Sequence, residues 1–247
     1  MSDKKLTRFD FLKMKAAGQK AVWITAYDYW TAHFAEQSGM DMLLVGDSLG
    51  MCIYGYAGTV PVTMDQCIYH SEAVRRGAPN TFVIGDMPFL SYQVSVENAV
   101  LNAGRFHKEA SVDAVKLEGG VRVCPQIRAI ADGGMLVMGH IGLTPQSSGQ
   151  QGGFKAQGRT AGAAKDVIDD ALAIEAAGAY ALLVDYHWLR TGALDTGYLT
   201  IWVSLAVISA TISLLSIRSI QQALGPFRDM FTRSGASTHE DLARLRP

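Results

Sequence analysis

Acidic side chains recur at the ends of the short apolar segments that we expect to form parallel strands. Asp28, Asp47, Asp86, Glu118 and Asp185 each stand at or just after the carboxyl end of such a segment. In a barrel of alternating strands and helices those ends converge on one face, so these carboxylates are expected to share one site. Grouped carboxylates repel one another and usually hold a hard cation or share protons. Mg²⁺ prefers one or two carboxylates with waters and substrate oxygens, which favours Asp47 and Asp86 as ligands.

Each carboxylate also has a simpler interpretation, because a single aspartate after a strand is more often a helix cap or a turn former. Lys116 adds to the functional interpretation, since it lies two residues before Glu118 and therefore on the same side of the strand. A lysine that points into a barrel needs an anion, which could be a substrate or simply a neighbouring carboxylate. His140 could bind substrate or donate a proton, or it could be a core histidine with its hydrogen bonds satisfied.

Short apolar segments alternate with helix-like segments over the first three quarters of the chain. We expect strands at 21–28, 40–47, 81–88, 114–120, 135–143 and 179–186, and helices at 29–39, 63–77, 94–110, 127–131 and 161–177. This alternation is typical of an α/β fold whose parallel sheet is covered by helices. The length fits a (β/α)8 TIM barrel in which units 7 and 8 are atypical or incomplete. An open doubly wound sheet is the alternative, weakened because no GxGxxG follows the first strand.

Composition excludes several classes of protein. The chain has 247 residues and a formal charge of −1, which gives no basic face for nucleic acid. Its three cysteines are widely spaced and form no CxxC pattern, so we expect no disulfide framework, no zinc site and a cytoplasmic location. The charged first fifteen residues do not resemble a secretory signal.

The composition changes near residue 186. We expect residues 1–186 to form barrel units 1–6 with the catalytic motifs, and residues 187–247 to be a divergent apolar segment. Residues 198–217 carry no charge, and as a helix they would span ~30 Å, about the thickness of a bilayer core. The run could instead supply buried strands, or the tail could be translated in a shifted reading frame. We favour a shifted or replaced tail and expect no association with a membrane.

Several motifs together resemble the ketopantoate hydroxymethyltransferase family, in family order over about residues 5–185. They are ITAYDY (24–29), LLVGDSLGM (43–51), VPVT (60–63), YHSEAVRRGAPN (69–80), GDMPF (85–89), VKLEGG (115–120), GHIGLTPQS (139–147), GGFKAQGR (152–159) and ALAIEAAGA (171–179). Motifs of this length in register are hard to obtain by chance, so the resemblance is specific.

The resemblance implies a (β/α)8 barrel that binds Mg²⁺ and uses 5,10-methylenetetrahydrofolate as co-substrate. The family transfers a hydroxymethyl group to the α-keto acid 3-methyl-2-oxobutanoate, giving 2-dehydropantoate for pantothenate and coenzyme A biosynthesis. Carried over by motif, Asp47 and Asp86 resemble the direct metal ligands and Glu118 a third metal-associated carboxylate. The substrate contacts implied are those two aspartates with Ser48 and Lys116. The resemblance also implies a homo-oligomer, and we assign no residue to the folate.

The chain departs from the family pattern at its predicted general base. The family has a glutamate at the end of strand six, where this sequence has Asp185 with a shorter side chain. The family's motifs for units 7 and 8 do not follow. Two alternatives therefore stay open: a C–C lyase or mutase that acts on another α-keto acid, and an inactive product with an altered tail.

Overall fold

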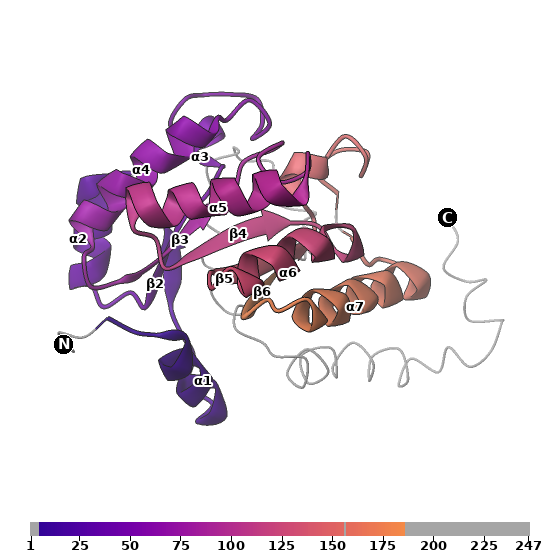
Figure 1. The fold of residues 1–247 in the computed structure, drawn as a ribbon, viewed down its shortest axis with the longest axis horizontal. Coiled ribbons are helices and arrows are strands. Elements are labelled where there is room, and N and C mark those ends of the chain that lie inside the picture. The colour runs from indigo at the N-terminus through magenta and orange to yellow at the C-terminus, as the bar shows by residue number, and fades with distance from the viewer. Residues whose placement is uncertain (1–4, 156, 186–247) are drawn as a thin grey trace, which may run out of the picture. The chain divides into compact units, whose positions relative to one another are not determined.

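Six parallel strands form one sheet, and each strand pairs with the next one along the chain (Figure 1). The computed structural model describes residues 5–155 and 157–185. The strands are β1 (Trp23–Thr25), β2 (Met42–Val45), β3 (Phe82–Asp86), β4 (Ala114–Glu118), β5 (Leu136–Gly142) and β6 (Ala181–Asp185). Each falls within its predicted segment. Because the spatial order never reverses, the sheet is that of a barrel rather than of a doubly wound fold.

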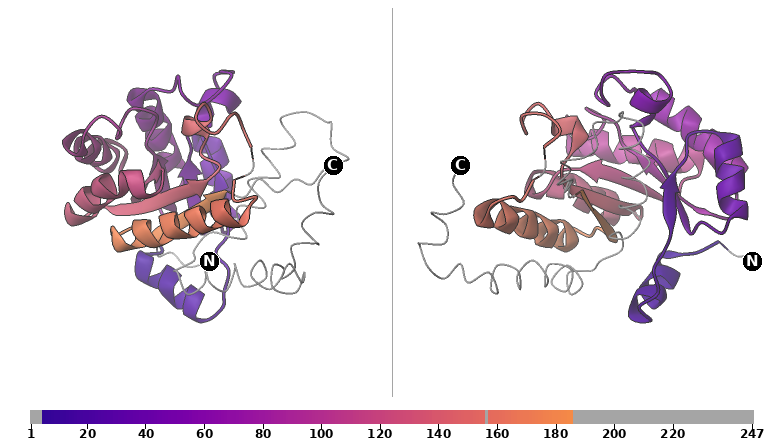
Figure 2. Two further views of the ribbon diagram at one scale, coloured as in Figure 1. Left: turned by 90° about the vertical axis from the view of Figure 1, so that its right-hand side faces the viewer. Right: turned by 180° about the vertical axis from the view of Figure 1, so that it is seen from behind.

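Helices follow the strands and cover one face of the sheet, whereas the first helix, α1 (Arg8–Ala16), precedes β1 and packs on the other face (Figures 1 and 2). The following helices are α2 (Tyr29–Gln37), α3 (Leu49–Cys52), α4 (Met64–Gly77), α5 (Val96–Ala110), α6 (Cys124–Asp132) and α7 (Ala161–Ala176), with 3-10 turns η1 (Val121–Val123) and η2 (Pro145–Ser147). The five predicted helices are confirmed, although α6 begins three residues before the predicted start at residue 127. The sequence interpretation did not predict α1 or α3. The described residues therefore contain the first six units of a (β/α)8 barrel.

Local sequence sets where the helices begin. Thr63 precedes α4, and its hydroxyl accepts a hydrogen bond from the Gln66 backbone N–H over 3.2 Å. The Gln66 side chain in turn accepts from the Thr63 backbone N–H over 2.9 Å. This reciprocal capping box satisfies two backbone donors that a helix start otherwise leaves unpaired.

One face of the sheet is apolar near the amino ends of the strands. Phe11 of α1 packs edge-to-face on Phe82, with ring centroids 5.2 Å apart, and joins a buried cluster from all six strands. The strand residues of that cluster are Trp23, Met42, Leu44, Phe82, Ile84, Ala114, Met138, Ala181 and Leu183. Side chains alternate along a strand, so Asp86, Lys116 and His140 continue this same face toward the carboxyl ends. The fold thus places a buried polar group directly beyond an apolar core.

The predicted second part of the chain, residues 187–247, lies outside the described residues, as does the apolar run 198–217. Among the helices of the described ranges, none combines the length and apolar character needed to cross a membrane.

Candidate active site at the carboxyl ends of the strands

The predicted acidic group forms at the ends of β2 and β3. Asp47 follows β2 and Asp86 ends β3, and both are buried, with 3% and 1% of their surface exposed. The Asp47 backbone N–H donates to Asp86 Oδ2 over 2.9 Å. The two residues therefore lie side by side, as a shared ion would require.

Lys116 occupies the neighbouring position on β4. It pairs with Asp86 in the strand register, and its Nζ lies 2.9 Å from Asp86 Oδ1 and 3.9 Å from Glu118 Oε1. Burial disfavours the charged ammonium, but the attraction of Asp86 and Glu118 outweighs it and raises the pKa of Lys116. The lysine is therefore a buried cation, and its partners include the neighbouring carboxylates that the simpler interpretation expected.

His140 brings β5 into the same group. Its Nδ1 lies 3.3 Å from Glu118 Oε1 and 3.3 Å from Lys116 Nζ, while its buried Nε2 has no hydrogen-bond partner within the described residues. Burial by itself would raise the pKa of Glu118, yet His140 and Lys116 together lower it. Glu118 is thus held as a carboxylate, and His140 keeps one ring nitrogen available.

Gln146 and Tyr92 belong to this group, and the sequence interpretation missed both. Gln146 Nε2 donates to Asp47 Oδ2 over 2.9 Å, and the Gln146 backbone N–H donates to Glu118 Oε2 over 3.0 Å. The Tyr92 hydroxyl donates to Gln146 Oε1 over 2.6 Å. Gln146 falls just after the fifth strand in the motif GHIGLTPQS, which could have marked it. Tyr92 lies in the irregular connection between β3 and α5, which offers no such signal.

The buried charges of the group do not balance. Three carboxylates, Asp47, Asp86 and Glu118, face one lysine and one histidine. Burial raises the pKa of Asp47, and repulsion from Glu118 adds to the effect. Burial likewise raises the pKa of Asp86, although Lys116 opposes it. A divalent cation would compensate this excess of negative charge.

The donor set fits a hard cation held by two carboxylates. Mg²⁺ is commonly bound by one or two carboxylates together with water and substrate oxygens, and Asp47 and Asp86 offer that pair. Among the described residues, no three His, Cys, Asp or Glu side chains are arranged to hold one ion together. The assignment of Glu118 beside the metal therefore stays a prediction.

Ser48 and Asp185 lie at the ends of β2 and β6. Ser48 is buried at the start of α3, with its Oγ 2.7 Å from the Tyr27 hydroxyl. Asp185 is partly buried at the end of β6, level with Gly142 of β5, and its carbonyl accepts from the Leu143 N–H over 3.0 Å. Both stand at the carboxyl edge of the sheet, as expected.

The expectation that Asp28 joins the acidic group was wrong. Asp28 is exposed and caps α2 instead: its Oδ1 accepts from the Thr31 backbone N–H over 2.9 Å and its Oδ2 from the Thr31 hydroxyl over 2.6 Å. A free backbone N–H two or three residues into a helix is the nearest donor for such a side chain, and here this local bond prevails.

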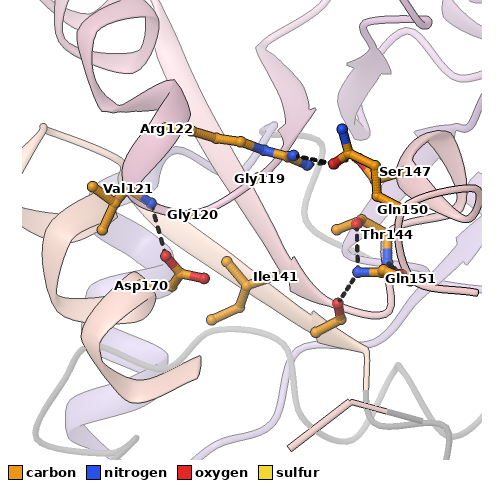
Figure 3. Close-up of a pocket in the computed structure, with 11 residues that line it drawn as sticks. Gly119, Gly120, Val121, Arg122, Ile141, Thr144, Ser147, Gln150, Gln151 and Asp170 are labelled. Atoms are coloured by element: carbon orange, nitrogen blue, oxygen red, sulfur yellow. Dashed lines mark hydrogen bonds between the residues drawn. The ribbon is translucent and has the colours of Figure 1, made fainter. Parts of the chain in front are cut away.

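A cavity of about 480 Å³ lies between η1, the end of β5, the β5–α7 connection and α7 (Figure 3). It is lined by residues 119–122, 141–142, 144, 147, 150–151 and 170. Arg122 donates across it to Ser147 Oγ over 2.6 Å and to Gln150 Oε1 over 2.8 Å. None of the predicted site residues lines this cavity, so the carboxylate group and the cavity are separate features.

A family profile described as ketopantoate hydroxymethyltransferase matches residues 5–194. The chain belongs to the ketopantoate hydroxymethyltransferase family. Among curated relatives named 3-methyl-2-oxobutanoate hydroxymethyltransferase, the protein of Alkaliphilus metalliredigens is 65% identical over 74% of this chain and 64% of its own length. That of Heliobacterium modesticaldum is 52% identical over 74% of this chain and 66% of its own length.

This member of the ketopantoate hydroxymethyltransferase family thus spans slightly less than two thirds of those two relatives. Among solved structures, phosphoenolpyruvate phosphomutase from Streptomyces platensis subsp. rosaceus superposes with a TM-score of 0.53 at 18% identity. That superposition covers 70% of this chain and 62% of the other. A likeness at that identity supports the barrel fold, in agreement with the sequential parallel sheet.

Proposed function

We propose that this chain transfers a hydroxymethyl group from 5,10-methylenetetrahydrofolate to 3-methyl-2-oxobutanoate, giving 2-dehydropantoate. The observation that carries the proposal is the adjacent pair Asp47 and Asp86 with Lys116 beside it, at the carboxyl ends of β2–β4, in a chain of this family. An α-keto acid presents a carboxylate and a keto oxygen, which suits a site that combines a hard cation with a fixed ammonium.

Asp47 and Asp86 would hold Mg²⁺, with Glu118 near it. When bound, that ion supplies Lewis-acid stabilisation of the negative charge that develops on the keto oxygen of the substrate. Burial raises the pKa values of both aspartates when no ion is bound. A bound cation would lower them again and so favour the carboxylate forms that hold it.

Lys116 and Ser48 would bind and orient the keto acid, together with the two aspartates. The Lys116 ammonium, kept charged by its carboxylate neighbours, would balance the negative charge of the substrate. The Ser48 hydroxyl is already positioned by Tyr27 and would offer a hydrogen bond. Fixing the substrate in this way removes much of the entropic cost of the reaction.

Asp185 would be the general base that takes the proton from C3 of the keto acid, so that C3 can form its bond to the one-carbon unit. Its place at the end of β6 supports this role, while its side chain is one methylene shorter than the family's glutamate. A displacement of ~1 Å can cost ~100-fold in rate, so we expect slow turnover that Asp185→Glu increases.

The test is formation of 2-dehydropantoate by the purified full chain with Mg²⁺, methylenetetrahydrofolate and the keto acid. Exchange of the C3 proton in D₂O is measured in parallel with the wild type, Asp185→Glu and Asp185→Asn. We expect Asp185→Asn to lower exchange by about 100-fold or more, the range of general-base catalysis. Absence of exchange, together with cleavage of a different keto acid, would favour the lyase or mutase alternative.

The remaining expectations also form part of the proposal. Residues 1–186 would carry the catalytic motifs, and residues 187–247 would be the divergent segment. The chain would act in the cytoplasm as a homo-oligomer, as family resemblance implies. Sedimentation of the purified full chain would give its oligomeric state.

A further inference from the structure

Gln146 connects the ends of three neighbouring strands. It lies in η2, is 5% exposed, and its Nε2 donates to Asp47 Oδ2 after β2 and to the Met87 carbonyl after β3, each over 2.9 Å. Its backbone N–H donates to Glu118 Oε2 at the end of β4 over 3.0 Å. One residue of the β5–α7 connection is therefore bonded directly to two carboxylates of the candidate site.

Two side-chain donors orient the Gln146 amide, the Tyr92 hydroxyl and, over a longer distance of 3.3 Å to Oε1, Gln93 Nε2. The Tyr92 hydroxyl accepts from the Glu118 backbone N–H over 3.1 Å, and it donates to Gln146 Oε1 over 2.6 Å. Since the hydroxyl has a single proton, this short bond makes Oε1 the acceptor and leaves Nε2 facing Asp47 and Met87. Turning the amide over would place Oε1 against two other oxygens, so only one orientation satisfies every partner.

Holding one oxygen of a carboxylate sets the plane of the whole group. By binding Asp47 Oδ2, Gln146 determines the direction in which Asp47 Oδ1 presents its lone pairs. Groups that orient metal ligands in this way commonly contribute about 10- to 100-fold to metal affinity. We infer that Gln146, oriented by Tyr92, is a positioning residue that holds the Asp47 carboxylate ready to bind a divalent cation. This inference rests on the cation site of the proposed function.

Gln151 offers a matched control on the same connection. Its Nε2 donates to the Gly142 carbonyl over 3.1 Å and to Thr144 Oγ1 over 2.9 Å, and its Oε1 accepts from the Thr144 N–H. It braces the connection without any bond to the carboxylates. A purely structural role for Gln146 therefore predicts similar effects from Gln146→Met and Gln151→Met, whereas a positioning role predicts different ones.

The experiment titrates Mn²⁺ into the full-length protein without substrate, by electron paramagnetic resonance, for the wild type, Gln146→Met and Gln151→Met. The melting temperature of each variant is recorded to verify folding. We expect Gln146→Met to weaken Mn²⁺ binding by about 10-fold or more and Gln151→Met by less than about 3-fold. In Gln146→Met the Tyr92 hydroxyl can still donate to the Glu118 carbonyl, 3.2 Å away, so it keeps a partner.

Tyr92→Phe is the second variant, and it tests the positioning role of Gln146 if Gln146→Met does not fold. It keeps Gln146 but removes the shorter of the two hydrogen bonds that its Oε1 accepts, the other coming from Gln93 Nε2 over 3.3 Å, so we expect Mn²⁺ affinity to fall by about 3- to 10-fold. Equal losses in Gln146→Met and Gln151→Met, or no loss in Tyr92→Phe, would overturn the inference and leave the proposed function standing. A wild-type protein that binds no Mn²⁺ would overturn the cation site of the proposed function as well.

Discussion

Lys116 Nζ lies 2.9 Å from Asp86 Oδ1, and both side chains are buried. The two residues are partners in the register of the adjacent strands β3 and β4. Among the described residues, Lys116 is the only lysine or arginine that forms an ion pair with any of the three buried carboxylates. Removing this side chain would leave buried negative charge without a protein cation. The free-energy cost of that is far larger than the stabilisation that the ion pair itself provides.

Lys116→Met should therefore lower the free energy of unfolding by about 3 kcal/mol, measured by urea denaturation without added metal. The control is Lys165→Met, the same change at an exposed lysine that pairs with Asp169 on α7, for which we expect no measurable change. Similar effects in both variants would mean that the buried carboxylates do not depend on Lys116.

Gly142 adopts a φ of +87°, and a Cβ added there would lie 2.3 Å from the Asp185 carbonyl oxygen. Gly142→Ala should destabilise the protein by about 1–3 kcal/mol, because it combines backbone strain with a contact that must shift the end of β6. Since Asp185 would move with it, turnover should fall by about 10- to 100-fold.

The control for Gly142→Ala is Gly162→Ala on α7, where nothing lies within 4 Å of the added Cβ. That variant should gain about 0.5 kcal/mol, because it restricts only the unfolded chain, and should keep wild-type turnover. Wild-type turnover in Gly142→Ala would show that the position of Asp185 does not limit the reaction.

Asp28 provides a test of the corrected assignment. Asp28→Ala removes the cap of α2 and should cost about 1 kcal/mol of stability, measured by thermal or urea unfolding. Mn²⁺ affinity and turnover should stay at the wild-type level, because Asp28 lies outside the carboxylate group. A loss of metal affinity in Asp28→Ala would show that Asp28 does contribute to the metal site.

His107 on α5 should make stability depend on pH. Its burial lowers its pKa below the ordinary 6.5, although Asp113 opposes the shift. Below pH 6.5 the unfolded chain takes up this proton more readily, so the wild type should lose stability as pH falls from 6.5 toward the lowered pKa. In His107→Gln this loss should be smaller, measured by urea denaturation between pH 7.5 and 5. If stability depended on pH in the same way in the wild type and in His107→Gln, His107 would not be the cause of the loss.

Local sequence determined the units of this fold and the edge at which its chemistry lies. Alternation and length indicated the six strands and five of the helices, and the motif resemblance indicated the family. These features depend on residues close together in the chain, whose preferences for helix, strand or turn act locally. The position of Lys116 beside Glu118 likewise followed from the period of a strand.

Only the tertiary structure decided which of the carboxylates meet. Asp28 and Asp47 both follow strands, yet Asp28 turns to its own helix while Asp47 bonds to Gln146, 99 residues further along the chain. Such a bond depends on the register of several strand pairs and on the path of a long connection, and neither is encoded in a local pattern. The sequence by itself therefore determined that a polar site would form at this edge, whereas packing determined its members.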